Sequence, residues 1–169
     1  YNVNKEVKTM AVKVRGKVVT TEKENQEIWL EMEKIYKSGK ARSIGVSNFS
    51  VDNIKNIMEV ASIAPQVNQI GYFIGYTEDE ITNYCQANNI LVEAYSPLAT
   101  GRLNKVEELK EIAKKYNKTW AQVALKFCLQ NNTVPLPKTN SKERALENID
   151  LDFVITPEDM KYLRTFKQV

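Results

Sequence analysis

Short apolar segments alternate with amphipathic helical segments along this 169-residue chain, and this alternation restricts its fold more than any other feature. Apolar strands are predicted at residues 42–46, 66–70, 90–95 and 133–136. Helices are predicted at residues 24–38, 105–116 and 141–149, and further helices are predicted to begin near Ser50, Thr77, Thr119 and Thr156. Buried strands that alternate with helices form parallel sheets. The sequence therefore predicts an α/β fold of about four parallel strand-helix units and a terminal helix.

Polar residues mark where several of these helices begin. Thr77 with Glu80, and Thr119 with Gln122, have the spacing of a capping box, in which two side chains satisfy free backbone N–H groups. Thr156 is followed by a proline, which is favoured at the first helical position.

Four strands cannot close an eight-stranded barrel. The predicted sheet therefore has two open edges, which are a liability unless another part of the protein covers them.

Length and composition indicate one globular domain over residues 1–169. Residues 1–23 are expected to form a loop or hairpin at the beginning of this domain. Apolar residues make up 43% of the chain, but no apolar run approaches the ~18 residues that span a bilayer. We therefore expect no membrane partner, and we expect a cytoplasmic location. Cys85 and Cys128 are isolated and have no CxxC spacing, so both are predicted to be small buried thiols in a reducing compartment.

The chain contains no histidine, which removes Ser-His-Asp and Cys-His catalysis and every histidine-ligated metal site. No metal site is predicted. The formal charge of +3 is small, and no basic stripe with interleaved aromatic residues follows the basic N-terminal region. Nucleic acid is therefore not an expected partner.

Residues suited to ligand binding follow three of the predicted strands. Ser47 and Asn48 follow the first, Gln69 ends the second and Tyr95 ends the third. Ligands bind at the carboxyl ends of strands in parallel α/β folds. An amide side chain can orient a planar carboxamide, and a tyrosine can stack on a flat ring. The alternatives at these positions are a turn that caps the next helix, a buried amide and a core aromatic residue.

The fourth strand is followed by a candidate phosphate site. Lys138, Thr139 and Arg144 come close to the start of the next predicted helix. Two cations, a hydroxyl group and the positive end of a helix suit a phosphate. An ordinary capped helix with solvated charges is the alternative, and neither a Walker loop nor a GxGxxG motif is present.

Together these segments resemble the NADPH-dependent aldo-keto reductase family. The motifs are GVSNF at residues 45–49, NQ at residues 68–69, EAYSPL at residues 93–98, PKT at residues 137–139, and ER followed by EN at residues 143–148. The resemblance covers residues 10–169. Within the family, the chain is similar to bacterial members such as diketogluconate reductases. It implies the C-terminal half of a (β/α)8 TIM barrel that binds NADP(H), with a small carbonyl compound as substrate.

The resemblance also implies a role for each matching residue. Ser47, Asn48 and Gln69 would hold the nicotinamide carboxamide, and Tyr95 would stack on the nicotinamide ring. The residues implied along the pyrophosphate are Ser96, Leu98 and Thr100. The residues implied at the 2′-phosphate are Lys138, Thr139 and Arg144, which favour NADP over NAD. The residues implied at the adenine are Glu147 and Asn148.

Two departures from the family pattern affect the predicted activity. An EYHP-like stretch is replaced by Gly71-Tyr72-Phe73-Ile74, which changes the substrate side. The family's catalytic Asp, Tyr, Lys and His lie in its first four strand-helix units, and nothing in residues 1–26 matches them. Tyr72 and Tyr95 have no lysine placed beside them by any motif. No catalytic residue is therefore assigned, and the chain alone is expected to be inactive.

Three interpretations remain open at this point. The chain is expected to be the second half of a carbonyl reductase whose catalytic residues lie upstream. A non-catalytic, NADP-binding or oligomerising half-barrel is the alternative, in which a second copy covers the open edges. A degenerate remnant that folds poorly is the third.

Overall fold

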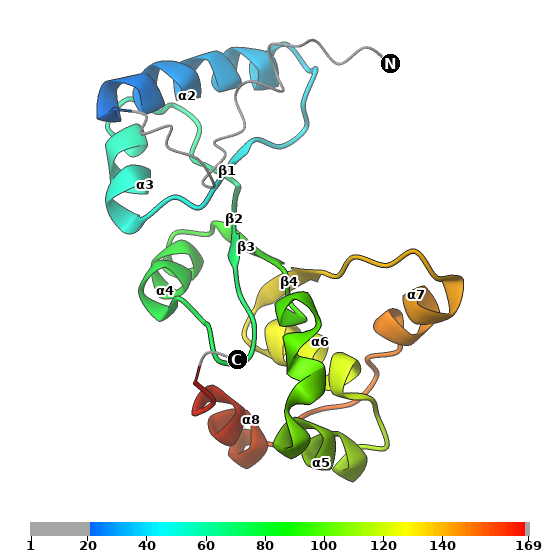
Figure 1. Ribbon diagram of the computed structural model, residues 1–169. Helices are drawn as coiled ribbons and strands as arrows, with labels where there is room; N and C mark the ends of the chain where they lie inside the picture. Colours follow the sequence, from blue (N-terminus) through cyan, green and yellow to red (C-terminus); the bar gives the residue numbers. More distant parts are fainter. Residues whose placement is uncertain (1–20, 168–169) are drawn as a thin grey trace. The chain divides into compact units, whose positions relative to one another are not determined.

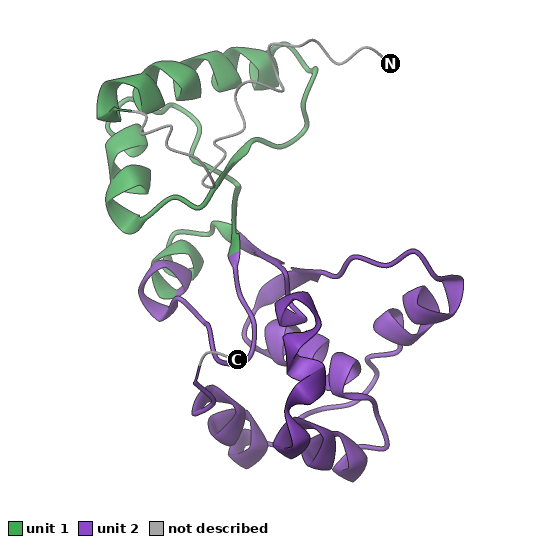
Figure 2. Ribbon diagram, viewed as in Figure 1, with its two compact units in different colours: residues 1–70, 83–91 green, residues 71–82, 92–169 purple. Residues whose placement is uncertain are grey.

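The computed structural model describes residues 21–167, which divide into two compact units (Figures 1 and 2). Unit 1 contains residues 1–70 and 83–91, and unit 2 contains residues 71–82 and 92–169. Each unit is described by itself. Most of the hairpin or loop predicted for residues 1–23 lies outside the described residues, and Glu22 and Lys23 form the start of a helix. The single-domain organisation stays a prediction.

Unit 1 contains two helices that pack together and a pair of parallel strands. Its elements are α2 (Glu22–Lys37), β1 (Gly45–Ser47), α3 (Val51–Met58) and most of β2 (Val67–Gly71). Strands β1 and β2 pair in parallel, with Ser47 opposite Gln69. Helix α2 contacts α3, and Trp29, Ile54 and Ile57 are buried. This pairing and burial follow the predicted pattern of apolar strands beside amphipathic helices.

A buried carboxylate ties α2 to the turn that follows α3. Glu33 is only 3% exposed. Its Oε1 accepts hydrogen bonds from the backbone N–H of Ser62 at 2.7 Å and of Ile63 at 2.8 Å. Its Oε2 accepts from the Ser62 hydroxyl at 2.5 Å and from Lys37 at 3.2 Å. Burial alone raises the pKa of Glu33, but these hydrogen bonds outweigh burial and hold the pKa at about 2.

Unit 2 is built around helix α6 (Trp120–Gln130). Helix α6 contacts strand β4 (Thr133–Leu136). It also contacts the helices α5 (Glu107–Lys115) and α7 (Lys142–Ile149) and the 3₁₀ helix η1 (Ala99–Lys105). The unit also holds most of β3 (Leu91–Tyr95) and α8 (Pro157–Arg164). Strands β3 and β4 pair in parallel, with Tyr95 opposite Leu136. Helix α6 is buried on most of its sides, and Val123, Leu125 and Phe127 are among its buried side chains.

Three predicted helix starts, at Ser50, Thr119 and Thr156, are confirmed, and one predicted capping box is wrong. Thr119 and Gln122 form the predicted capping box, and Thr156 caps α8 with a proline in its first turn. The capping box predicted from Thr77 and Glu80 is not formed. Helix α4 (Asp79–Ala87), which both units share, begins at Asp79, and the preceding Glu78 has a φ of 44°. Thr77 is therefore one residue too early to be the cap, and its carbonyl accepts from the Thr82 hydroxyl instead.

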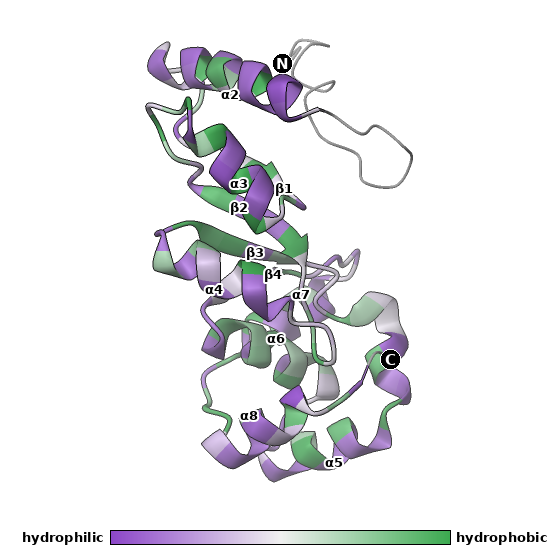
Figure 3. Ribbon diagram, turned by 90° about the vertical axis from the view of Figure 1, so that its left-hand side faces the viewer, coloured by the Kyte–Doolittle hydropathy of each residue, from purple (hydrophilic) through white to green (hydrophobic). Residues whose placement is uncertain are grey.

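The elements differ in their hydropathy (Figure 3). Strand β3 is coloured mainly hydrophobic, whereas α2 and α5 carry both hydrophobic and hydrophilic residues. Cys85 and Cys128 are free and buried, which confirms the prediction for both thiols. Among residues 21–167, no helix has the length and apolarity that a bilayer-spanning segment requires. The same residues contain no group of three or more Cys, Asp or Glu side chains that could hold a metal ion.

Candidate functional site

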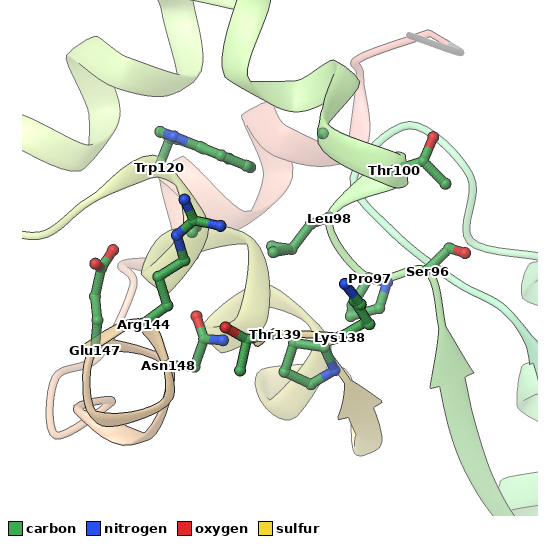
Figure 4. Close-up of a pocket in the computed structure, with 13 residues that line it drawn as sticks. Ser96, Pro97, Leu98, Thr100, Trp120, Lys138, Thr139, Arg144, Glu147 and Asn148 are labelled. Carbon is green, nitrogen blue, oxygen red and sulfur yellow. The ribbon is translucent and has the colours of Figure 1, made fainter. Parts of the chain in front are cut away.

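A pocket of about 680 Å³ lies within unit 2, where the ends of β3 and β4 meet the starts of α6 and α7 (Figure 4). Its lining includes seven residues that the sequence assigns to cofactor binding: Ser96, Leu98, Lys138, Thr139, Arg144, Glu147 and Asn148. Thr100, expected beside the pyrophosphate, lines it as well. The other lining residues are Pro97, Gly101, Trp120, Ala121 and Pro137. The volume lies in the range of small-molecule sites.

The wall that follows β3 has an unusual backbone. Ser96, Ala99 and Thr100 have φ values of 53°, 48° and 54°, and Gly101 has a φ of 87°. Left-handed conformations of residues other than glycine cost on the order of 1–3 kcal/mol each and cluster at ligand sites. Two backbone hydrogen bonds hold the turn, from the Ala99 N–H to Ser96 at 2.8 Å and from the Gly101 N–H to Leu98 at 2.9 Å. The turn brings Leu98 and Thr100 to the pocket.

The opposite wall carries two cations without acidic partners. Neither Lys138 nor Arg144 forms an ion pair with an acidic side chain within residues 21–167. Arg144 lies in the first turn of α7, and Lys138 lies in the segment that leads to the helix; the cap of α7, Ser141, accepts from the Arg144 N–H at 3.3 Å. Thr139 is fixed nearby, because its hydroxyl accepts from the Ser141 N–H at 3.1 Å. Two unpaired cations at the positive end of a helix suit a phosphate group.

The third wall is formed where the end of α7 docks on the start of α6. The Thr119 hydroxyl donates to Glu147 Oε1 at 2.7 Å. Gln122 is 4% exposed, and its Nε2 donates to the carbonyl oxygens of Glu147 at 3.1 Å and Asp150 at 3.0 Å. The same Gln122 accepts from the Thr119 N–H at 2.9 Å through Oε1. Gln122 therefore fixes the backbone that carries Glu147 and Asn148 at the pocket.

We expect Gln122→Glu to destabilise the protein by about 2 kcal/mol. The carboxylate keeps the acceptor of the capping box, but it removes the donor that serves two carbonyl oxygens and places a negative charge against them. Urea unfolding measures the change. Asn83→Asp, at an exposed position on α4, is the matched amide-to-acid control and is expected to stay within ~0.5 kcal/mol of the parent protein. Equal stability of the two variants would show that Gln122 does not join α6 to α7.

Trp120 is one of five pocket residues that the sequence analysis did not assign to the site. It directly follows the capping residue Thr119 and is the first residue of α6. The available signal was its position, because the first turn of a helix after a capping box faces the same edge as the strand ends. The apolar spacing of α6 drew attention to the buried face of the helix instead.

The residues predicted to bind the carboxamide lie together in unit 1. The Ser47 hydroxyl donates to the Gln69 carbonyl oxygen at 3.0 Å, and Asn48 Nδ2 donates to the Ser47 hydroxyl at 3.1 Å. The Asn48 N–H also donates to the Gln69 carbonyl oxygen at 2.9 Å. Asn48 adopts a φ of 55°, a left-handed conformation that asparagine tolerates. The register of β1 and β2 thus gathers three polar side chains at one strand end.

Tyr95 does not line the pocket, although it ends β3 in the same unit. Its ring is 39% exposed, and its hydroxyl oxygen lies 3.3 Å from the position that a Cβ on Gly71 would take. Gly71 therefore leaves room for the Tyr95 ring tip. Tyr72, the other tyrosine considered for proton transfer, is fully buried. Burial raises the pKa of Tyr72, which is the opposite of what a proton donor near neutral pH requires.

Comparison with known proteins gives one consistent result. The model of the Aldo/keto reductase family matches residues 17–168. Glyoxal reductase of Bacillus subtilis (strain 168) is 43% identical over 136 residues, which are 80% of this chain and 49% of the relative. The chain spans about half the length of the curated relatives it matches.

Two solved structures extend the comparison to the fold. An aldo-keto reductase from a Medee basin deep-sea metagenome library matches with a TM-score of 0.82 and 35% identity, over 86% of this chain and 56% of that one. The aldo-keto reductase AKR2E5 of the silkworm, Bombyx mori, complexed with NADPH, matches with a TM-score of 0.78 and 35% identity, over 83% of this chain and 47% of that one. These matches confirm the predicted fold class.

Proposed function

This chain belongs to the aldo/keto reductase family, and from that membership we propose that it binds NADP(H) for the reduction of aldehydes or ketones to alcohols. The single observation that carries the proposal is the pair of unpaired cations, Lys138 and Arg144, in one pocket with Glu147 and Asn148. The cations suit the 2′-phosphate that distinguishes NADP from NAD. The carboxylate and the amide suit the donor and acceptor groups along the edge of adenine.

The residues around the pocket of unit 2 fit the adenosine and pyrophosphate part of the dinucleotide. We assign the 2′-phosphate to Lys138, Thr139 and Arg144, and the adenine to Glu147 and Asn148. We assign the pyrophosphate to Ser96, Leu98 and Thr100. These eight residues lie around the same pocket. NADPH supplies the hydride when it is bound.

The nicotinamide end is assigned to the other group of residues. Ser47, Asn48 and Gln69 hold one another by hydrogen bonds and offer hydroxyl and amide groups to a carboxamide. The exposed face of Tyr95 offers a surface for a flat ring. None of these residues moves a proton in the proposal, and Tyr72 is excluded by its burial. The proton for the alcohol therefore comes from the catalytic residues that the family carries and that we do not assign within this chain.

The proposal is tested by calorimetry with the 169-residue chain. NADP+ is expected to bind at least about 10-fold more tightly than NAD+, because charge-assisted hydrogen bonds contribute about 1.5–3 kcal/mol each. The chain alone is expected not to oxidise NADPH in the presence of glyoxal, the substrate named for the Bacillus subtilis relative. Equal affinity for the two dinucleotides would contradict the cofactor assignment. Hydride transfer to glyoxal would contradict the division of catalytic from binding residues.

Exposed apolar side chains on the β3–β4 pair favour a further protein partner. Tyr95, Val134 and Leu136 are 39%, 38% and 41% exposed, and Tyr95 pairs directly with Leu136. We propose that the additional half present in full-length relatives covers this face in the active protein, as opposed to a second copy of the chain. A monomer in light scattering of the isolated chain agrees with this proposal, whereas a stable dimer favours the second copy. A cytoplasmic location stays our expectation, in keeping with two free thiols.

A further inference from the structure

We propose that Trp120 is the adenine-stacking residue of this chain and that its indole ring is the main apolar contact of the bound dinucleotide. The inference rests on the proposed function of the pocket and adds a recognition residue to it. The juxtaposition that carries it is an indole ring and the Arg144 guanidinium in the lining of one pocket, together with the carboxylate and amide groups of Glu147 and Asn148 (Figure 4).

The two tryptophans of the chain have different surroundings. Trp29 is 2% exposed, and its indole N–H donates to the Ile63 carbonyl oxygen at 3.0 Å. Trp120 is partly exposed at the pocket, and its indole N–H has no hydrogen-bond partner among residues 21–167. A tryptophan that serves the core buries its ring and pairs its N–H, as Trp29 does. Trp120 presents a large flat surface to the pocket without either property.

The backbone holds Trp120 firmly at this position. It is the first residue of α6, between the capping residue Thr119 and the buried Ala121. The capping box fixes the start of the helix through Thr119 and Gln122, and the same two residues bind Glu147. The indole and the proposed adenine contacts therefore share one rigid support. Because the backbone is already ordered before binding, only the side-chain torsions of Trp120 remain to be restricted when the ring stacks on a ligand.

The arrangement of polar groups around Trp120 suits a purine. Figure 4 shows Trp120, Arg144, Thr139 and Asn148 around the same pocket. A guanidinium plane and an aromatic face both stack on a base. Glu147 Oε1 is occupied by the Thr119 hydroxyl, whereas Oε2 has no partner among the described residues and can accept from the exocyclic amine of adenine. The pocket therefore offers both a ring that can stack on a base and polar groups that can bind the edge of that base.

Fluorescence and calorimetry with 2′,5′-ADP test the inference without any reaction. This probe carries the adenosine and the 2′-phosphate of NADP but no nicotinamide. We expect it to quench the indole emission of the parent protein, and we expect no quenching in Trp120→Phe, where Trp29 is the remaining indole. Trp120→Phe should bind 2′,5′-ADP within about 3-fold of the parent. Trp120→Ala should bind about 5- to 100-fold more weakly, since base stacking contributes ~1–3 kcal/mol.

Trp120→Leu separates stacking from simple filling of the pocket wall. Leucine keeps an apolar side chain but offers no flat ring, so its affinity should fall with that of the alanine variant. Leucine affinity equal to that of phenylalanine would overturn the stacking role, as would unchanged indole emission together with unchanged affinity of Trp120→Ala. Failure of the parent protein to bind 2′,5′-ADP would instead overturn the proposed function of the pocket. Circular dichroism confirms that each variant is folded before its affinity is compared.

Discussion

Replacing Arg144 by alanine is expected to weaken NADP+ binding by about 10- to 100-fold while changing NAD+ binding little. The guanidinium lies in the pocket without an acidic partner, so no internal ion pair is lost with it. A charge-assisted hydrogen bond to a phosphate contributes about 1.5–3 kcal/mol, which corresponds to this range of affinity. Since NAD lacks the 2′-phosphate, the effect should be confined to NADP. Calorimetric titration of both dinucleotides measures it.

Lys142→Ala is the matched control for this prediction. Lys142 is an exposed lysine in the first turn of the same helix and does not line the pocket. The control changes the net charge by the same amount, so a general electrostatic effect would appear in both variants. Adding Lys138→Ala to Arg144→Ala should lower NADP+ affinity further, towards that of NAD+. An equal loss of both dinucleotides in Arg144→Ala would remove Arg144 from the 2′-phosphate site.

Replacing Glu33 by alanine is expected to destabilise the protein by about 3 kcal/mol. The change leaves the N–H groups of Ser62 and Ile63 and the Ser62 hydroxyl without their acceptor. Unsatisfied buried donors cost about 1–3 kcal/mol each, although water that enters the vacated space recovers part of that cost. Urea unfolding at pH 7 measures the difference. Glu33→Gln keeps one acceptor oxygen and should lose less.

The same carboxylate makes stability depend on pH in a defined direction. The pKa of Glu33 is lowered from 4.5 to about 2 in the folded state. Its ionised form therefore contributes about 3 kcal/mol above pH 4.5, and this contribution is lost as the pH falls from about 4.5 towards 2. The parent protein should lose this stability on acidification, and Glu33→Gln should lose correspondingly less over the same window. Parallel pH profiles for the two proteins would contradict the role of the buried charge.

Glu31→Gln supplies the control for both measurements on Glu33. Glu31 lies on the same helix and forms an ion pair with Lys34 at 2.6 Å, but both side chains are more than half exposed. Exposed ion pairs of this kind contribute less than about 1 kcal/mol. The Glu31 variant should therefore unfold close to the parent at every pH. A loss as large as that of Glu33→Ala would show that charge on α2, and not the buried hydrogen bonds, determines stability.

Local signals in the sequence predicted the elements that depend on neighbouring residues. The capping boxes at Ser50 and Thr119 form because a small polar residue and an amide three residues later satisfy each other's backbone groups. Lys138, Thr139 and Arg144 were predicted because they follow a parallel strand and suit a phosphate. These predictions required only spacing and side-chain chemistry. The resemblance to the family, and not the spacing, implied Ser96, Leu98, Glu147 and Asn148.

Features that depend on tertiary contacts were beyond the same reasoning. The left-handed turn at Ala99 and Thr100 is held by backbone hydrogen bonds and is not signalled by residues that favour such a conformation. Thr77 had the spacing of a cap, but the φ of Glu78 moved the start of the helix. Trp120 was not assigned, since periodicity does not distinguish a ring that fills the core from one that faces a ligand. Glu33 gave no sign of burial, because its partners are 29 and 30 residues away.

The pocket of unit 2 is assembled from one uninterrupted stretch of polypeptide, residues 96–148. The residues proposed to distinguish NADP from NAD therefore lie in one continuous segment of the sequence. Recombination within this family could exchange such a segment between reductases and transfer coenzyme preference with it, leaving the reacting end of the parent untouched. The preference for one coenzyme and the preference for one carbonyl substrate can therefore evolve independently.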